Sequence, residues 1–417
     1  MLRLLVHDAR PGMVLDQAVP HPANAGVTLL RAGVTLDERV LARLPEMGVR
    51  ELWIRCPRLR DLAKFTDPRI VAANGKLLVM ASGALDPQSG DHVRIDYNAY
   101  RKAVVGVIDL LAARPRAAIL LGEIAAGSSL PLRHAGTVCF LSLLMGLKLD
   151  FYLIRERAAR LGALAARDLS SLGLGALLHD IGVQRLVPDV IERWNQTHDE
   201  SDPQWREHVK LGFEAVKNEL DPSAVAVVLH HHQHFDGSGF PPRTELSGLE
   251  RPLEGNDIHV FARIAAAADL YARLRHPAHA PGATEKSLPS VPAVRALAQM
   301  LRPAYRGRID PVVLRALLMV APPYPPGTLV TLNDTTRAVV VALNQAEPCR
   351  PCVEIIRAID ANLSFDDARG ERINLAKDRT LAITHVDGVS VAADNFEPTR
   401  PDEFNLDAFV PASRRAG

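Results

Sequence analysis

The chain has 417 residues, and 47% of them are apolar, so it has material for more than one hydrophobic core. Its 49 Lys and Arg residues balance 48 Asp and Glu residues, which leaves a net charge of +1. This balance gives no electrostatic reason to expect a long nucleic acid or an anionic membrane as the main partner. It leaves room for a small anionic ligand held by local charges or by metal.

The sequence also gives no sign of export or of membrane insertion. No charged start followed by an apolar run is present, so we read no signal peptide. The most apolar stretch, Val138 to Leu147, is about half as long as a bilayer requires. Four cysteines fit a reducing compartment. We therefore expect a cytoplasmic protein without a membrane span.

The first part of the chain has the pattern of a small α+β module. Residues 10–15, 26–33 and 49–54 are predicted as strands, and residues 36–48 as a helix that ends at Gly48. We assign residues 1–60 to this module. Turn-forming residues over 82–92 indicate a loop, and helical spacing runs from Tyr97 to about Ala126, so 61–128 is read as linker and helix.

The centre of the chain is predicted to be helical and the end to be rich in strands. Helical periodicity covers 134–147, 151–180, 204–219, 223–234, 257–274 and 291–302, so we place a helical core at 129–320. Strand patterns at 325–334, 336–345 and 351–360 indicate a β-rich module over 321–417, with the last twenty residues loosely ordered. Cys349 and Cys352 could form a redox pair or half a zinc site; because no second pair follows, we expect an incidental pair.

Two short motifs place histidine and aspartate at the ends of predicted helices. The first is LLHDIG at 177–182, with His179 next to Asp180. Buried in a helix end, these side chains require a partner, which leaves two readings: a hydrogen-bonded pair, or ligands of a metal between helices. Neighbouring positions on a helix diverge by about 100°, which disfavours direct pairing and suits two neighbouring cations.

The second motif is HHHQHFDGSGF at 230–240. Its histidine run is either a solvated polar face or a source of ligands, and the adjacent His231 and His232 suit two neighbouring cations. The tight turn that follows contains Asp236, Gly237 and Gly239, and its backbone could approach a ligand closely. A helix that ends in histidines beside such a turn is a plausible floor for a phosphate site.

The histidines and aspartates between residues 134 and 269, taken together, indicate a function more specifically than either motif alone. Mixed imidazole and carboxylate ligands suit Fe, Mn, Ni, Co or Zn rather than Mg or Ca. Helical bundles build binuclear sites from one or two inward ligands per helix. Two metals about 3.5–4 Å apart are suited to the hydrolysis of phosphodiesters.

Several segments resemble the HD-GYP family of cyclic di-GMP phosphodiesterases, within the HD superfamily of metal-dependent phosphohydrolases. They are HDIG at 179–182, REHVKLGFE at 206–214, HHQHFDGSGFP at 231–241, ADLY at 268–271 and PYPPGTLVTLND at 323–334. The resemblance covers roughly 129–340, with the segments in the family's order. It implies a mainly α fold: an all-helical HD-type core flanked by the small α+β N-terminal and β-rich C-terminal modules.

The resemblance also implies a set of metal ligands. Its members are His134, His179, Asp180, His208, His231, His232 and Asp269. One of two divalent transition metal ions (Fe, Mn, Ni or Zn) would bind His134, His179 and Asp269, and the other His208, His231 and His232. Asp180 would bridge them, so that Asp180 and His179 act in catalysis and a water between the cations attacks phosphorus. His230 and His234 would be neighbours rather than ligands.

Several positions depart from the family pattern where it meets the substrate. The family's HDIGK has Val183 in place of lysine, HHE has Gln233 in place of glutamate, and GYP has Phe240 in place of tyrosine. Leu130 replaces a glutamate that supplies a third metal in some members, which implies a binuclear site. Arg185 is the nearest cation that could replace the lysine. The predicted substrate-binding residues are Arg185, Asp236, Gly237, Gly239 and Phe240.

The leading prediction is hydrolysis of cyclic di-GMP to linear pGpG or GMP in bacterial second-messenger signalling. The first alternative is a receptor of the same fold that binds cyclic di-GMP or a protein partner with little turnover. A third reading is hydrolysis of another phosphoester by the same metals. Retention of all seven ligands favours the enzyme, whereas loss of the phosphate lysine favours the receptor. Signalling protein partners and a homodimer are left open.

Overall fold

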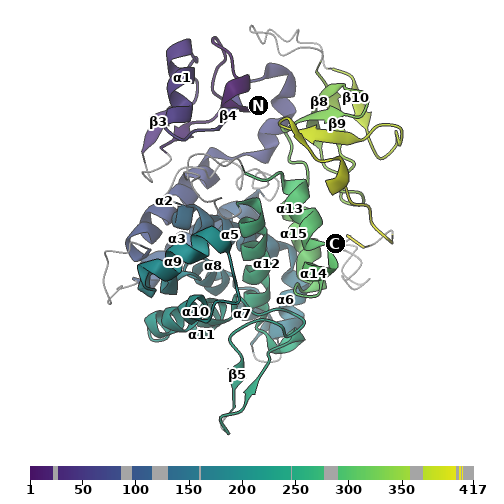
Figure 1. Ribbon diagram of the computed structural model, residues 1–417. Helices are drawn as coiled ribbons and strands as arrows, with labels where there is room; N and C mark the ends of the chain where they lie inside the picture. The colour runs from purple at the N-terminus through teal and green to yellow at the C-terminus, as the bar shows by residue number, and fades with distance from the viewer. Residues whose placement is uncertain are drawn as a thin grey trace.

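The computed structural model describes residues 1–21, 27–85, 96–114, 130–158, 161–245, 247–276, 290–356, 370–400, 403–404 and 406. Figure 1 shows a body of helices and, above it, a smaller part in which the N-terminal strands and the C-terminal sheet lie side by side. The mainly helical fold with a β-rich C-terminal part is confirmed. Much of the predicted loop at 82–92, the predicted helix beyond residue 114 and most of the last twenty residues lie outside the described residues.

The helical body has one large apolar core. Its central helices are α5 (Leu130–Lys148), α8 (Ser170–Leu177), α10 (Pro203–Val216), α11 (Pro222–His230), α12 (Val260–Arg275) and α15 (Pro311–Val320). The others are α2 (Pro68–Ala84), α3 (Tyr97–Ala113), α6 (Asp150–Arg157), α7 (Ala163–Ala166), α9 (Pro188–Thr197), α13 (Ala293–Met300) and α14 (Pro303–Arg306). Because α11 packs against α8, α10 and α12, and α5 against α8 and α12, inward side chains from all five helices can meet.

An Asp-Pro pair starts four of these helices. In each, the aspartate side chain accepts a hydrogen bond from a backbone N–H of the first turn, and the proline occupies the position where its fixed φ suits a helix. The pairs are Asp67-Pro68 of α2, Asp202-Pro203 of α10, Asp221-Pro222 of α11 and Asp310-Pro311 of α15. The starts of α10 and α11 are thereby fixed, and with them the positions of His208 and His231.

The single long helix predicted over 151–180 is wrong, because α6, α7 and α8 replace it. Gly162 precedes α7, and the Asp168 side chain accepts from the Ser170 backbone N–H at 2.8 Å where α8 begins. Apolar side chains continue through these turns into the core, so periodicity alone did not reveal the breaks. As a result α8 ends just before the His179-Asp180 pair.

Gly182 lets the segment after this pair lie directly on α10. It belongs to the short 3-10 helix η4 (Ile181–Arg185). A Cβ atom at Gly182 would collide with the backbone of His208 and of Gly212. The glycine of the HDIG motif is therefore required by close packing of two backbones.

The N-terminal segment forms short strands around one helix. Strand β1 (Leu2–Leu5) pairs antiparallel with β4 (Glu51–Ile54), and β2 (Val19–Pro20) with β3 (Thr28–Leu30). Helix α1 (Glu38–Glu46) lies within the range predicted for it. The strand predicted at 10–15 is reduced to isolated bridges at Val14 and Leu15.

The C-terminal part is a six-stranded antiparallel sheet with the order β10-β9-β8-β7-β11-β12. Its strands are β7 (Leu329–Leu332), β8 (Arg337–Ala342), β9 (Cys352–Ile355), β10 (Arg372–Asn374), β11 (Ile383–Val386) and β12 (Val389–Ser390). One apolar cluster contains both N-terminal residues and side chains of this sheet. Glu354, which is 0% exposed, joins them further by accepting from Arg58 Nε at 2.6 Å and Arg372 Nε at 2.8 Å.

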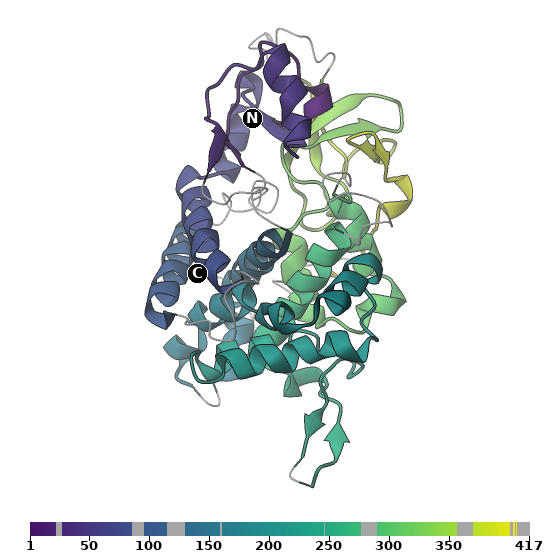
Figure 2. The same ribbon diagram turned by 60° about the vertical axis from the view of Figure 1, so that its left-hand side comes forward.

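Other features complete the fold. Strands β5 (Arg243–Thr244) and β6 (Glu250–Arg251) form a hairpin that projects from the helical body (Figure 2).

Cys349 and Cys352 are free, and burial raises the pKa of Cys349 to about 12, which disfavours a reactive thiolate. In the part of the chain that the structure describes, no single helix is long and apolar enough to cross a membrane. The adjoining helices Pro131–Lys148 and Asp150–Arg157 meet those criteria only as a pair bent by 86°.

Candidate metal centre

Three histidines are oriented by the backbone of their own segments. Their Nδ1 atoms lie within hydrogen-bonding distance of the carbonyl oxygen three residues earlier: 2.8 Å from His179 to Ala176, 2.6 Å from His208 to Trp205 and 2.9 Å from His231 to Val228. A carbonyl can only accept, so Nδ1 carries the proton in each ring. The Nε2 atom of each ring is therefore available as a ligand atom.

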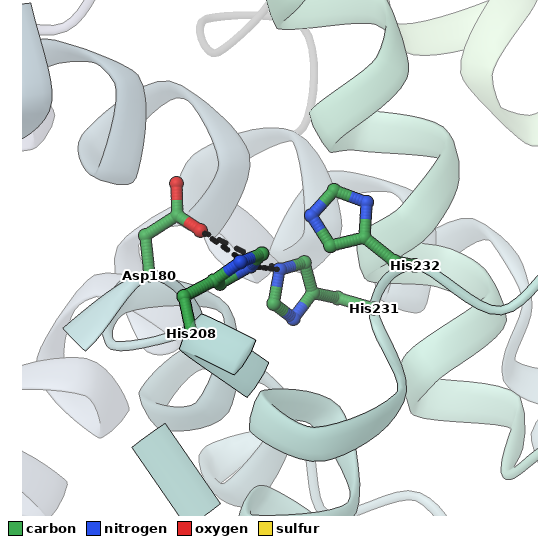
Figure 3. Close-up of side chains that lie close together, drawn as sticks. All are labelled: Asp180, His208, His231 and His232. Carbon is green, nitrogen blue, oxygen red and sulfur yellow. Dashed lines mark hydrogen bonds and ion pairs between the residues drawn. The ribbon is translucent and has the colours of Figure 1, made fainter. Parts of the chain in front are cut away.

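Asp180 lies between two pairs of these ligand atoms. Its Oδ1 is 3.6 Å from His208 Nε2 and 3.5 Å from His231 Nε2, as Figure 3 shows. Its Oδ2 is 3.3 Å from His179 Nε2 and 3.8 Å from His134 Nε2. Burial raises the pKa of this carboxyl, but His179 and then His231 lower it well below its ordinary value, so the group is ionised. One carboxylate thus presents an oxygen to each pair.

The arrangement of His208 and His231 fits a bound cation. Their Nε2 atoms face each other at 3.4 Å, and both side chains are 0% exposed. Two nitrogen lone pairs at this distance repel unless a positive charge lies beside them. Burial, followed by the charge of His232, lowers the pKa of His208 well below its ordinary value, so protonation of that ring is disfavoured. A metal ion there would be held by both nitrogens and Asp180.

The remaining ligands form a second group on the other side of Asp180. Asp269 Oδ1 lies 3.0 Å from His134 Nε2, whose ring lies next to that of His179. Burial lowers the pKa of His179, but Asp180 raises it overall, to about 9, so a proton competes for the place of a cation. The two sets whose ligand atoms lie within 4.8 Å of one another are Asp180, His208, His231 and His232, and His134, His179 and Asp269. All seven predicted ligands are therefore brought together, with donor atoms that fit divalent transition metals.

Comparison with known proteins agrees with this geometry. A family model described as an HD domain matches residues 148–313, and one described as a KOW domain associated with HD domain matches residues 329–390. The chain is 26% identical over 360 residues to a Pseudomonas aeruginosa protein named as a cyclic di-GMP phosphodiesterase, and the alignment covers 78% of each chain. Residues 148–313 therefore match an HD domain, and most of the chain is similar to this phosphodiesterase.

Other relatives match over shorter regions. A 3'3'-cGAMP-specific phosphodiesterase of Vibrio cholerae is 29% identical over 28% of this chain and 21% of its own length. A cyclic di-GMP phosphodiesterase response regulator of Xanthomonas campestris pv. campestris is 32% identical over 27% of this chain and 28% of its own length. Among solved structures, an HDG"Y"P protein from Bdellovibrio bacteriovorus has a TM-score of 0.43 and 19% identity, covering 76% of this chain and 97% of that one.

Residues 236–241 form a turn, the HD-GYP turn, that packs against the metal ligand His232. Phe240 is buried and its ring stacks on His232, with centroids 4.7 Å apart and planes 14° apart. Gly239 has no room for a side chain, because a Cβ there would collide with the backbone from His232 to His234. Asp236 accepts from the Ser238 backbone N–H at 3.0 Å, which shapes the turn.

The predicted substrate-binding residues differ in how near they lie to the metal ligands. Phe240 and Gly239 lie against His232, whereas Asp236 and Gly237 form the adjoining turn, in which Gly237 has a φ of +80°. Arg185 ends η4, six residues after His179, and is half-buried. Each stays a proposal as a substrate contact.

Two departures from the HD-GYP pattern have visible structural consequences. Val183 is half-buried in η4, so no cation stands at the position of the motif's lysine. Gln233 is 2% exposed; its Nε2 donates to the Pro241 carbonyl, and its Oε1 has no hydrogen-bond partner within the described residues. Gln233 thus supports the HD-GYP turn.

The other two histidines of the opening motif are not part of either ligand group. His230 ends α11 and is half-buried, and burial, followed by the charge of His231, lowers its pKa to about 4. His234 Nδ1 lies 2.9 Å from Ser238 Oγ in the HD-GYP turn. Both lie beside the ligands.

Sequence reasoning missed two charged residues beside the ligands. Arg273 lies one turn after Asp269 on α12, and its Nη2 is 2.8 Å from Asp269 Oδ2. This i, i+4 spacing was a readable signal. Glu200 lies in the connection between α9 and α10, with Oε1 3.7 Å from His232 Nδ1. Nothing in its local sequence indicated that contact.

Proposed function

We propose that this chain is a metal-dependent phosphodiesterase that hydrolyses cyclic di-GMP to linear pGpG or GMP. The observation that carries the proposal is the position of Asp180, whose two oxygens face two separate groups of histidine ligands. Two divalent cations, when bound, supply Lewis acidity to the phosphoryl oxygens and lower the pKa of water. Relatives named as cyclic di-GMP phosphodiesterases support the choice of substrate.

The protein's own contribution is orientation. The carbonyls of Ala176, Trp205 and Val228 fix the tautomers of three ligands before any ion arrives. The exposed fraction is 28% for Asp180 and 23% for His134, so the open side of the centre lies at these two side chains. The other ligands in contact with Asp180 are 0% exposed: His179, His208 and His231. We place the scissile phosphate on the open side.

We further propose two ions per chain, of Fe, Mn, Ni or Zn. Five imidazoles and two carboxylates form a donor set of intermediate softness, which suits these metals better than Mg or Ca. Leu130 stands where some HD-GYP proteins have a glutamate for a third ion. A binuclear site follows from that replacement.

A receptor role is the second candidate, because Val183 leaves the position of the motif's lysine without a cation. Such a protein would bind cyclic di-GMP and release it intact.

The deciding experiment uses full-length protein reconstituted with Mn²⁺ or Fe²⁺ under anaerobic conditions. Metal content is measured by elemental analysis, and cyclic di-GMP products are separated by chromatography. Asp180→Asn, which keeps the side-chain size, is the control. Metal-dependent product formation that the control lacks supports the enzyme. Intact nucleotide in the presence of fully loaded protein contradicts it, and nucleotide retained by that protein in equilibrium dialysis then identifies the receptor.

A further inference from the structure

A chain of charged side chains connects the two ligand groups. Arg273 Nη2 is 2.8 Å from Asp269 Oδ2, and Arg273 Nη1 is 2.5 Å from Glu200 Oε1. Glu200 Oε1 is in turn 3.7 Å from Nδ1 of His232. Asp269 belongs to one ligand group and His232 to the other. The connection therefore runs from the first group through Arg273 and Glu200 to the second.

We propose that Arg273 and Glu200 are positioning residues that orient Asp269 and His232 together, so that both metal groups are prearranged by one ion pair. This assignment rests on one part of the proposed function, namely that metal ions bind these ligands. Neither Arg273 nor Glu200 belongs to either ligand group. They act through the ligands and not on the substrate.

Arg273 determines which oxygen of Asp269 remains available to bind a metal ion. The Asp269 side chain is 3% exposed, so water cannot satisfy its second oxygen. The guanidinium forms an ion pair with Oδ2, which has no hydrogen-bond partner within the described residues, while Oδ1 lies 3.0 Å from His134 Nε2. A planar guanidinium can hold two carboxylates at once through separate N–H groups, which a lysine ammonium cannot do with the same directionality.

Glu200 determines which ring nitrogen of His232 carries the proton. A carboxylate facing Nδ1 favours the tautomer with the proton on Nδ1 and leaves Nε2 as the ligand atom. The other side of the geometry is fixed by Phe240, whose ring stacks on that of His232. Within the described residues, the ring of His232 has no backbone carbonyl contact of the kind that orients His179, His208 and His231. The carboxylate of Glu200 takes that role.

The position of Glu200 is itself fixed. Its backbone carbonyl accepts from Arg206 Nε at 2.7 Å, and its Oε2 lies 3.5 Å from Arg308 Nη1. Glu200 also offsets the positive charge of Arg273, which would otherwise repel cations bound nearby. The pair thus holds the ligands without leaving a full positive charge beside them.

The test is a titration of metal-free full-length protein with Co²⁺. Calorimetry measures the affinity, and the visible absorption of the bound ion reports its coordination. The variants are Arg273→Gln, Glu200→Gln and the double variant. We expect each single change to weaken Co²⁺ binding by about 10–100-fold and to alter the absorption bands. We expect the double variant to lose little more than either single one, because the two residues act as a unit.

Arg263 provides a matched control on the same helix. Its Nη1 lies 2.8 Å from Asp310 Oδ2 and its Nη2 2.5 Å from Glu156 Oε2, but neither carboxylate is a ligand. Arg263→Gln should lower the melting temperature and keep wild-type Co²⁺ affinity and spectrum. Arg273→Lys should recover only part of the affinity lost in Arg273→Gln.

If Arg273→Gln does not fold, Glu200→Gln carries the test, because its side chain is 23% exposed and lies in a connection between helices. Folded Glu200→Gln or Arg273→Gln with wild-type affinity and spectrum would overturn the assignment. So would fully additive losses in the double variant. Wild-type protein that binds Co²⁺ with these variant effects but never hydrolyses cyclic di-GMP would contradict the proposed function and leave the positioning assignment in place.

Discussion

The Nε2 atoms of His208 and His231 face each other at 3.4 Å, while each Nδ1 is committed to a backbone carbonyl. Neither ring can turn to relieve this contact without breaking the hydrogen bond of its buried Nδ1–H. The protein therefore holds two lone pairs together at a cost that a cation removes. Folding and metal binding should be linked at this pair.

The first prediction is that metal stabilises the folded protein. Mn²⁺ at about 100 times its dissociation constant should add about 2.7 kcal/mol to the free energy of unfolding. Thermal unfolding followed by circular dichroism, with and without a chelator, measures the difference. In Asp180→Asn the gain should be much smaller. An equal gain in this variant would show that the ion stabilises some other part of the chain.

The second prediction concerns Val183. A charge-assisted hydrogen bond contributes roughly 1.5–3 kcal/mol, so Val183→Lys should raise kcat/KM on cyclic di-GMP by about tenfold or more. The gain should shrink at high salt because part of it is electrostatic. If Arg185 already serves the phosphate, Arg185→Ala is the damaging change and Val183→Lys is nearly silent. Silence of both variants in an active enzyme would show that neither position meets the phosphate.

The third prediction is that Gly239→Ala disrupts the metal centre. The new methyl group would collide with the backbone from His232 to His234, which cannot yield as a flexible side chain could. The variant should lose metal and at least about 1–3 kcal/mol of stability, the usual cost of overpacking. Gly106→Ala on α3 is the control, because nothing lies within 4 Å of its Cβ, and it should be neutral or slightly stabilising. Normal metal content in Gly239→Ala would contradict this account of the turn.

The fourth prediction is a pH dependence of stability at the start of α2. The side-chain hydrogen bond from Arg69, partly opposed by burial, lowers the pKa of Asp67 from 3.8 to about 2. A lowered pKa in the folded state means that the stabilisation is present above about pH 4 and is lost as the pH falls towards 2. Asp67→Asn keeps a capping oxygen but removes the charge.

Wild type should therefore be more stable than Asp67→Asn near neutral pH, and the difference should disappear towards pH 2. Denaturant unfolding at several pH values measures it. A difference that stays constant over this range would mean that the capping geometry, rather than the charge, matters.

Local sequence signals predicted the helical class and the β-rich end, because apolar periodicity is a local property. They did not reveal the breaks around Gly162 and Asp168, since apolar side chains continue into the core through both turns. They also could not show that Leu2–Leu5 pairs with Glu51–Ile54, or that Glu354 lies between Arg58 and Arg372. Such pairings depend on contacts between distant segments.

The candidate ligands and their division into two groups around Asp180 could be named from the family resemblance, and the structure brings the same two groups together. Arg273 lay within reach of sequence reasoning because it follows Asp269 by one helical turn. Glu200 did not, because a connection between two helices brings it to His232. Side chains that act through tertiary contact carry no local pattern.

We propose that Asp180 joins two ions into one working centre. Metal-free protein should be titrated anaerobically with Mn²⁺ while cyclic di-GMP hydrolysis is measured at each addition. Product formation should stay low through the first equivalent and rise as the second binds, and Asp180→Asn should show no rise. Full activity at one equivalent per chain, or wild-type activity in Asp180→Asn, would contradict the proposal.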